Sequence, residues 1–247
     1  MAEVEHINPY GDDGRAKDRQ VQSMFDTIAP AYDFMNRAMT GGMDRLWLRA
    51  LVKAAHGQHV RDVADLATGT GDVAIALARR MPQARIIGID LSEGMLDKAR
   101  AKVAAHDYAG RISFRQGDCL ATGLADASVD LITVAYGVRN FADLAAGYRE
   151  MFRILRPGGK LCVLELSQPV SAVPKALYRL YTSTLIPLAG RLLSHDRRAY
   201  SYLPESIAAA PQRYAMTALI NEAGFDRASF RQLTFGACTL YTAYKAK

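Results

Sequence analysis

Hydrophobic and polar residues follow two alternating patterns from about residue 60 onward. Continuous apolar runs are typical of buried strands, and apolar residues repeated every three or four positions are typical of helices packed on a sheet. Their alternation predicts a parallel sheet with helices on both faces. The expected strands are 60–66, 85–89, 111–116, 129–135 and 160–166, and the expected helices are 71–80, 92–105 and 143–155.

The two ends of the chain depart from this alternation. Residues 1–18 are polar and rich in glycine and aspartate, so we expect a mobile N-terminal arm. Between 19 and 57 the apolar residues recur at helical spacing and predict several short helices. Near the other end, the pattern predicts a helix at 212–222 and a hairpin of strands at 226–233 and 236–245.

Together these elements predict an α/β fold in one domain over residues 19–247, with a seven-stranded, mainly parallel sheet and a C-terminal antiparallel strand. Residues 170–210 are expected to form an apolar helical insertion. Two interpretations of this insertion stay open. It is either a packed helix pair, or a lid or interfacial helix that contacts a hydrophobic substrate. A membrane span is excluded there, because the charge-free stretch within 174–193 is far shorter than about 20 residues.

Composition narrows the functional classes. The net charge of +6 comes from bases scattered among acids, which does not indicate nucleic-acid binding but suits contact with an anionic membrane surface. The three cysteines contain no C-x-x-C pair, so neither disulfides nor a metal site are expected. Because the N-terminal residues include no apolar leader, we expect a cytoplasmic protein, either free or peripheral at the inner face of the membrane.

The most informative segment is 63–72, where an apolar strand meets a glycine turn that opens a helix. Gly69 and Gly71 allow the backbone to bend sharply and to approach a ligand closely. Nineteen residues after Gly71, the next strand ends in Asp90. This is the spacing at which an acidic residue reaches ribose hydroxyls in doubly wound folds. The segment therefore predicts a site for a nucleoside-containing cofactor.

Acidic residues in the turn favour one cofactor over another. The glycine pattern also fits a loose dinucleotide fingerprint, but the carboxylate of Asp72 would repel a pyrophosphate. S-adenosylmethionine has no phosphate and carries a sulfonium and an ammonium group, which suit Asp65 and Asp72. We therefore expect S-adenosylmethionine beside Asp65, Gly69 and Gly71. An NAD(P)-dependent oxidoreductase and a turn that only packs a helix on the sheet are the alternatives.

Four further elements stand out along the chain: Tyr32-Asp33-Phe34-Met35-Asn36, Gly137-Val138-Arg139-Asn140, Glu165-Leu166-Ser167 and Tyr202-Leu203-Pro204-Glu205-Ser206-Ile207. With the glycine turn and a Pro-Gly-Gly element at 157–159, they resemble the ubiquinone/menaquinone biosynthesis C-methyltransferase family over roughly residues 20–245. The resemblance implies a Rossmann-like class I methyltransferase fold and S-adenosylmethionine as cofactor. The cofactor contacts that it implies are Thr70, Asp90, Leu91, Asp118, Cys119 and Ala135.

The resemblance also implies a reaction, the methylation of a ring carbon of a prenylated quinol. We favour demethylmenaquinol as substrate and menaquinol as product. The alternatives are the matching ubiquinone precursor and another small molecule. Two further alternatives are a methyltransferase for a polar acceptor and a membrane-associated scaffold without activity. A homodimer is compatible with the resemblance.

Carbon methylation requires an electron-rich ring, which a quinol provides when one hydroxyl loses its proton. Because a phenolic hydroxyl has a pKa of about 10, the protein must favour the ionised oxygen. We expect Arg139 to stabilise that oxygen, Asn140 to hold the ring and Asp72 to accept the proton. The plainer alternatives are a surface arginine at 139 and helix caps at 140 and 72.

Overall fold

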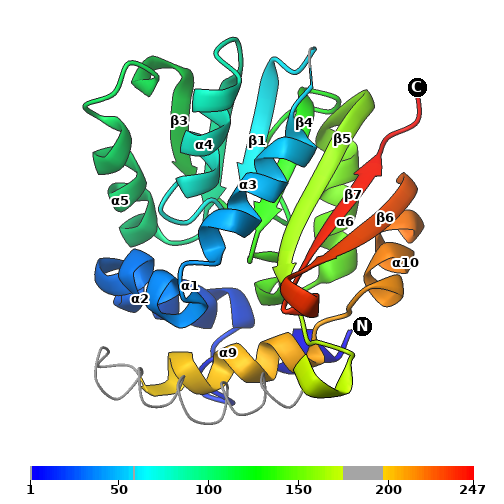
Figure 1. The fold of residues 1–247 in the computed structure, drawn as a ribbon. Helices are drawn as coiled ribbons and strands as arrows, with labels where there is room; N and C mark the ends of the chain where they lie inside the picture. Colours follow the sequence, from blue (N-terminus) through cyan, green and yellow to red (C-terminus); the bar gives the residue numbers. More distant parts are fainter. Residues whose placement is uncertain (1, 58, 175–196) are drawn as a thin grey trace.

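Seven strands form a single sheet in a computed structural model that describes residues 2–57, 59–174 and 197–247. The strand order is β3-β2-β1-β4-β5-β7-β6 (Figure 1). Neighbouring strands from β3 to β5 are parallel, whereas β7 runs antiparallel to both β5 and β6. The predicted fold class is therefore confirmed. The strands are β1 (Asp62–Leu66), β2 (Arg85–Asp90), β3 (Ile112–Gln116), β4 (Val129–Ala135), β5 (Leu155–Leu166), β6 (Asp226–Leu233) and β7 (Cys238–Tyr244).

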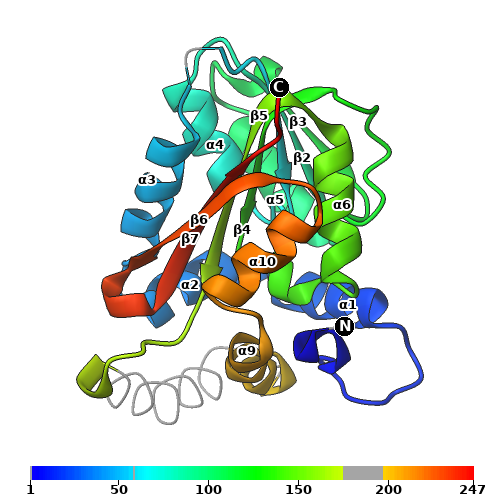
Figure 2. The same cartoon turned by 90° about the vertical axis from the view of Figure 1, so that its right-hand side faces the viewer.

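Helices cover both faces of this sheet, and each face has its own apolar core. On one face, α3 and α4 pack against the sheet around Trp47 and Leu77, and Val103 of α5 joins the same core. On the other face, α6 and α10 pack around Tyr148 and Ile220 (Figure 2). The helices are α3 (Asp44–Ala55), α4 (Asp72–Arg80), α5 (Glu93–Val103), α6 (Leu144–Ile154) and α10 (Tyr214–Glu222).

The strand expected at 160–166 begins five residues earlier, at Leu155. Pro157-Gly158-Gly159 has the composition of a turn, yet β5 continues through it. Leu155 already pairs with Val129 of β4, across a register shift. Gly158 adopts a φ of +79° and donates its N–H to the carbonyl of Lys245 at 2.9 Å. Pairing with neighbouring strands thus outweighs the local turn preference.

Additional helices lie across the end of the sheet where the parallel strands finish (Figure 1). These are α1 (Lys17–Ile28), the short η2 (Ala29–Ala31), α2 (Tyr32–Thr40) and α9 (Arg197–Ala209). Ligands of such sheets bind beyond the carboxyl ends of the strands, so these helices cover the expected binding edge. Most of the apolar segment 174–193 lies outside the described residues. Within the described part of the chain, no helix has the length and apolar character needed to cross a membrane.

The first residues of the N-terminal segment, which was expected to form a mobile arm, pack against the domain in the structure. Val4, in the short helix η1 (Glu3–His6), is fully buried in the core around α6. The carboxylate of Glu5 accepts hydrogen bonds from the backbone N–H groups of Ala2 at 2.9 Å and Leu144 at 2.8 Å. Lys17 donates to the carbonyl of Val4. These contacts were not expected from the sequence, because one buried valine and its distant partners give no periodic signal.

This packing can be tested by substituting Val4→Ala. Removing two buried methyl groups and leaving a small cavity should lower the free energy of unfolding by about 2 kcal/mol. Val173→Ala makes the same change at a side chain that is 71% exposed and should have almost no effect. Urea denaturation of both variants measures the difference. Equal stability of the two variants would mean that the arm contributes nothing.

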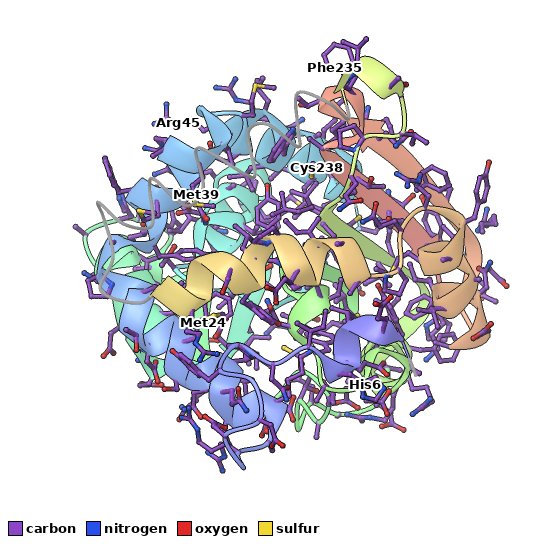
Figure 3. The ribbon with its side chains drawn as sticks, turned by 90° about the horizontal axis from the view of Figure 1, so that it is seen from below. His6, Met24, Met39, Arg45, Phe235 and Cys238 are labelled. Atoms are coloured by element: carbon purple, nitrogen blue, oxygen red, sulfur yellow. The ribbon has the colours of Figure 1, made fainter. Side chains whose placement is uncertain are left out.

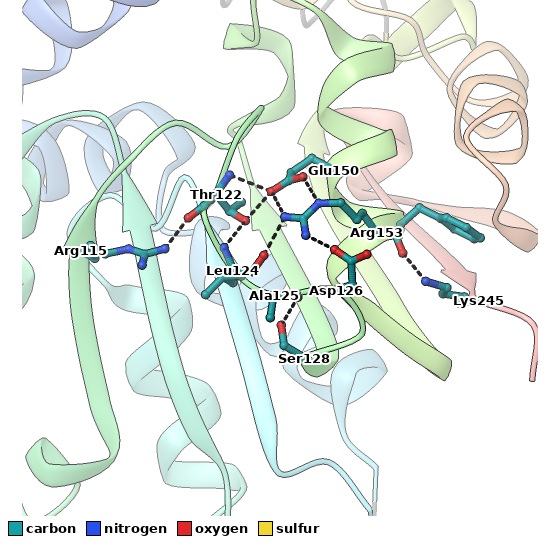
Figure 4. Close-up of polar contacts among 10 residues, drawn as sticks. Arg115, Thr122, Leu124, Ala125, Asp126, Ser128, Glu150, Arg153 and Lys245 are labelled. Atoms are coloured by element: carbon teal, nitrogen blue, oxygen red, sulfur yellow. Dashed lines mark hydrogen bonds and ion pairs between the residues drawn. The ribbon is translucent and has the colours of Figure 1, made fainter.

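A polar network holds the loop between β3 and β4, whose first residues reach the binding edge. The carboxylate of Glu150 on α6 accepts from the Thr122 N–H at 2.8 Å and from the Thr122 hydroxyl at 2.5 Å. Arg153 binds the same carboxylate at 2.7 Å and donates to the carbonyl of Leu124 at 2.8 Å (Figure 4). The network fixes a loop that carries Asp118 and has no regular structure of its own.

Candidate functional site

Two cavities meet at the carboxyl ends of the parallel strands, under the covering helices. The first, called here the cofactor cavity, lies over β1, β2 and β4 and is closed by α1. The second, called here the substrate cavity, lies between α1, α2, α3 and α9 and has a volume of about 550 Å³. Both cavities share the wall residues Phe25, Tyr32, Tyr136 and Asn140. The two cavities are therefore neighbours along these four residues.

Six of the residues expected to contact a cofactor line the cofactor cavity: Gly69, Asp90, Leu91, Asp118, Cys119 and Ala135. They come from four different strand ends or the loops that follow. The topology brings them together because parallel strands end at one edge.

Asp90 organises the glycine turn from the neighbouring strand. Its carboxylate accepts the N–H of Gly69 at 2.8 Å and the N–H of Ser92 at 2.9 Å. Burial raises the pKa of Asp90 above its ordinary value, although these two N–H groups favour the charged form. Gly71 has a φ of +81° at the start of α4, and an added Cβ would lie 3.0 Å from Ala99 and Phe114. The turn therefore needs glycine for its conformation and for its close packing.

Three other expected contacts, Asp65, Thr70 and Gly71, are not among the described residues that line either cavity. Asp65 lies inside the sheet, where its carboxylate accepts the hydroxyls of Thr68 at 2.5 Å and Thr133 at 2.6 Å. Its role in the structure is to tie β1, the turn and β4 together. The sequence could not separate this role from ligand contact, because both use an acid next to a glycine turn.

The burial of Asp65 gives a pH-dependent prediction. Burial raises its pKa from 3.8 to about 6, so the folded state prefers the protonated form. The stability that this preference provides is present below about pH 4 and is lost as the pH rises through about 6. Asp65→Asn should therefore be more stable than the wild type by about 1–3 kcal/mol at pH 8 and no more stable at pH 4. Thermal unfolding of both proteins across this pH range measures the difference. If Asp65→Asn were less stable than the wild type by the same amount at every pH, the prediction would be contradicted.

The substrate cavity is mainly apolar and rich in methionine. Its lining includes Met24 and Ile28 of α1, Met35 and Met39 of α2, and Leu203 of α9. In the view from below, Met24 and Met39 lie on either side of α9 (Figure 3). Flexible thioether side chains adapt to irregular apolar groups, so the cavity suits a hydrophobic ligand.

Arg139 and Asp44 are the charged residues in the described lining of this cavity, and Arg139 is not a surface arginine. Its Nη1 binds Glu165 Oε1 at 2.7 Å and donates to the carbonyl of Tyr136. Burial works against the charged form, but the Glu165 carboxylate outweighs it and raises the pKa of Arg139. The Nε–H has no hydrogen-bond partner among the described residues. Arg139 is thus a buried cation held in place through its Nη1.

Asn140 lies beside it in the shared wall and does not cap a helix. Its Oδ1 accepts the hydroxyl of Tyr202 on α9 at 3.0 Å, and its Nδ2 donates to the carbonyl of Tyr136 at 3.4 Å. The cap of α6 is Asp143, which accepts the N–H of Ala146 at 2.7 Å. These contacts fix the carboxamide between α9 and the end of β4.

The model of the ubiE/COQ5 methyltransferase family matches residues 14–245. The chain belongs to this family. It is 45% identical to the demethylmenaquinone methyltransferase of Bacteroides fragilis, over 98% of both chains. It is also 42% identical to the ubiquinone/menaquinone biosynthesis C-methyltransferase UbiE of Geobacter sulfurreducens, over 93% of this chain and 90% of the relative. The protein is accordingly a methyltransferase, and the expected resemblance is confirmed.

Solved structures show the same fold at low sequence identity. Phosphoethanolamine N-methyltransferase 2 of Haemonchus contortus, in complex with S-adenosyl-L-methionine, is 15% identical with a TM-score of 0.63, over 90% of this chain and 57% of that chain. The apo form of the S-adenosylmethionine-dependent methyltransferase SibL has a TM-score of 0.62 at 19% identity, over 84% of this chain and 57% of that one. The sheet and its helices are therefore the methyltransferase fold.

Asp72, expected to accept the substrate proton, is placed elsewhere in this methyltransferase. Its carboxylate pairs with Lys102 at 2.7 Å, and its side chain is 53% exposed. It is not among the described residues that line the substrate cavity. Because Asp72 pairs with Lys102 and is not among the described residues that line either cavity, we do not assign it the proton.

The aromatic residues of the shared wall were not assigned to the site from the sequence. Phe25 and Tyr32 fit a helical apolar pattern, which indicates core packing. Tyr136 directly follows β4 and has a φ of +58°, an uncommon conformation outside glycine. The sequence signal for Tyr136 is its position, directly after a strand end and directly before the Gly-x-Arg-Asn element.

Proposed function

We propose that this protein transfers a methyl group from S-adenosylmethionine to a ring carbon of demethylmenaquinol and so forms menaquinol. The observation that carries the proposal is the single wall shared by the cofactor cavity and an apolar cavity that contains Arg139. The names of the relatives support it, since three of those most similar are demethylmenaquinone methyltransferases. The methyl donor is S-adenosylmethionine.

The residues of the cofactor cavity fit this donor. Asp90 provides a buried carboxylate for the ribose hydroxyls, and Gly69 leaves room beside it. Asp118 and Cys119 line the same cavity and would contact the adenine. Bound there, the cofactor supplies an electrophilic methyl group on a sulfonium.

The chain's own chemistry acts on the acceptor ring. The positive charge of Arg139 in the wall of the substrate cavity favours ionisation of a ring hydroxyl and stabilises the resulting oxygen. Asn140 holds the ring at the shared wall, because its own carboxamide is fixed by Tyr202. The apolar lining excludes water, which strengthens both interactions.

A direct assay tests this function. Purified protein is given isotope-labelled S-adenosylmethionine with demethylmenaquinol, the demethylated benzoquinol precursor of ubiquinone, or a polar catechol. We expect the naphthoquinol to react fastest and the catechol to react least. Mass spectrometry of quinones from cells that lack the protein should show the demethyl form accumulating. Preference for the polar acceptor, or no change in the cellular quinones, would overturn the proposal.

We also propose that the protein, expected in the cytoplasm, contacts the inner face of the membrane around the substrate cavity. Phe34 of α2, Leu46 of α3 and Phe235 after β6 are large exposed apolar side chains at this end. Arg37 and Arg45 are exposed beside them, and Arg45 and Phe235 are seen from below in Figure 3. Apolar side chains among bases suit an anionic lipid surface, where a prenylated quinol would also lie.

Vesicle sedimentation tests the membrane contact. Binding to phosphatidylglycerol vesicles should exceed binding to phosphatidylcholine vesicles and should fall in the double variant Phe34→Ser, Phe235→Ser. Tyr214→Ser is the matched control, because Tyr214 is 81% exposed but lies on α10, away from the cavity. Equal binding of both variants to both vesicles would contradict this contact.

A further inference from the structure

Lys102, which the sequence did not single out, joins three separate elements beside the cofactor cavity. Its Nζ binds Asp33 Oδ2 of α2 at 2.6 Å, Asp72 Oδ1 of α4 at 2.7 Å and the hydroxyl of Thr70 in the glycine turn at 2.8 Å. An ammonium group has three N–H donors. Each of them can thus be matched to an acceptor from a different part of the chain.

Thr70 completes the cluster. Its hydroxyl donates to Asp33 Oδ1 at 2.6 Å, so both carboxylate oxygens of Asp33 are engaged. Without the ammonium, Asp33 and Asp72 would face each other as like charges. We call this cluster the α2 clasp; it consists of Lys102, Asp33, Asp72 and Thr70. The clasp explains why Thr70 and Asp72, both expected at the active site, face Lys102 in the structure.

The clasp sits one residue away from the wall between the two cavities. Asp33 follows Tyr32, and Tyr32 lines both the cofactor and the substrate cavity. Holding Asp33 on the glycine turn therefore holds the N-terminal turn of α2, with Tyr32, over the point where the cavities meet. Loss of the clasp would free that turn of α2 and open the wall.

The neighbouring helix α1 has a separate attachment. The carboxylate of Asp26 accepts the hydroxyl of Ser92 at 2.5 Å and the N–H of Gly94 at 3.1 Å. This attachment does not use Lys102. The attachments of α1 and α2 described here thus use different side chains, and of these two only that of α2 includes a cation.

We propose that Lys102 is a positioning residue for methyl transfer, which keeps α2 closed over the cofactor and so slows cofactor release and completes the substrate wall. The proposal rests on the proposed function in one respect, since the substrate wall is the wall of the quinol cavity. Lys102 acts through Asp33 and Thr70 and does not itself line either cavity among the described residues.

The test compares Lys102→Met with Lys98→Met in the full-length protein. Lys98 is on the same helix, α5, and is exposed, so the control removes the same charge one turn away. We expect Lys102→Met to release S-adenosylhomocysteine about fivefold faster, because a partly exposed network contributes on the order of 1 kcal/mol. The KM for the quinol should rise by a similar factor, with kcat within about twofold. Lys98→Met should match the wild type. Lys102→Arg, which keeps the charge, should release S-adenosylhomocysteine at a rate between those of the wild type and Lys102→Met.

Hydrogen exchange supplies a readout that a general loss of stability would not give. In Lys102→Met, the amides of α2 should exchange faster, whereas those of α1 should be unchanged because the Asp26 attachment remains. Adding Asp33→Asn to Lys102→Met should cause little further increase in the exchange of the α2 amides, since both changes remove the same contact. High salt should speed cofactor release in the wild type and not in Lys102→Met.

Two outcomes would overturn the role of Lys102: unchanged release of S-adenosylhomocysteine in Lys102→Met, or equally faster exchange in α1 and α2. Both readouts are made without any quinol. A wild type that binds S-adenosylhomocysteine but methylates no quinol would therefore refute the proposed substrate and leave the clasp standing.

Discussion

Arg139→Met is expected to abolish methyl transfer and to lower the free energy of unfolding by about 3–5 kcal/mol. The large stability loss arises because Glu165, only 2% exposed, would be left as an unpaired buried charge. The activity is lost because the ring oxygen would no longer face a cation. Binding of S-adenosylhomocysteine, measured by calorimetry at a temperature where the variant is folded, should stay close to that of the wild type.

The double variant Arg139→Met, Glu165→Gln separates the two effects. Removing the buried carboxylate together with its partner should recover most of the lost stability, because no unpaired charge remains. Turnover should stay absent. If the double variant regained activity along with its stability, Arg139 would be a structural residue and the proposed chemistry would fail.

Asp90→Ala is expected to weaken the binding of S-adenosylhomocysteine by about 100-fold or more. The change removes the carboxylate expected to accept the ribose hydroxyls and leaves the N–H groups of Gly69 and Ser92 without their acceptor. The glycine turn then loses both its ligand contact and its support. Isothermal titration calorimetry measures the affinity directly.

Asp97→Ala is the matched control, since Asp97 is an exposed aspartate on α5 that pairs only with Arg100 among the described residues. Its affinity should equal that of the wild type. Burial raises the pKa of Asp90. As the pH is lowered, the affinity of the wild type for S-adenosylhomocysteine should therefore begin to fall at a higher pH than it would if Asp90 had the pKa of an ordinary aspartate. Normal affinity in Asp90→Ala would reject the ribose assignment.

Much of the fold followed from local patterns. The strand at 129–135 has the expected bounds, and the second strand of the hairpin begins two residues later and ends one residue earlier than expected. Ser92 caps α5 as its position predicts, accepting the N–H of Met95 at 3.1 Å. Such features depend on neighbours within a few residues, so periodicity and cap chemistry are enough to predict them.

The residues expected to bind the cofactor also differ in whether local sequence or a distant partner decides their role. Gly69 and Asp90 are recognisable because a glycine turn and an acid at a fixed spacing both lie at strand ends, and parallel topology brings strand ends together. Asp72 carries the same local signal, yet its partner Lys102 is thirty residues away. A carboxylate looks the same in a sequence whether it faces a ligand or a lysine.

Spacing within short segments was enough to predict the order of strands and helices along the chain, the glycine turn and the edge of the sheet where the site lies. The packing of distant residues settles which acids face the cavity, how Arg139 is held by Glu165, and that α2 is tied to α5 by Lys102. Those contacts join residues that are far apart in the chain, and their energies depend on burial and distance. Neither quantity is fixed before the helices pack over the sheet.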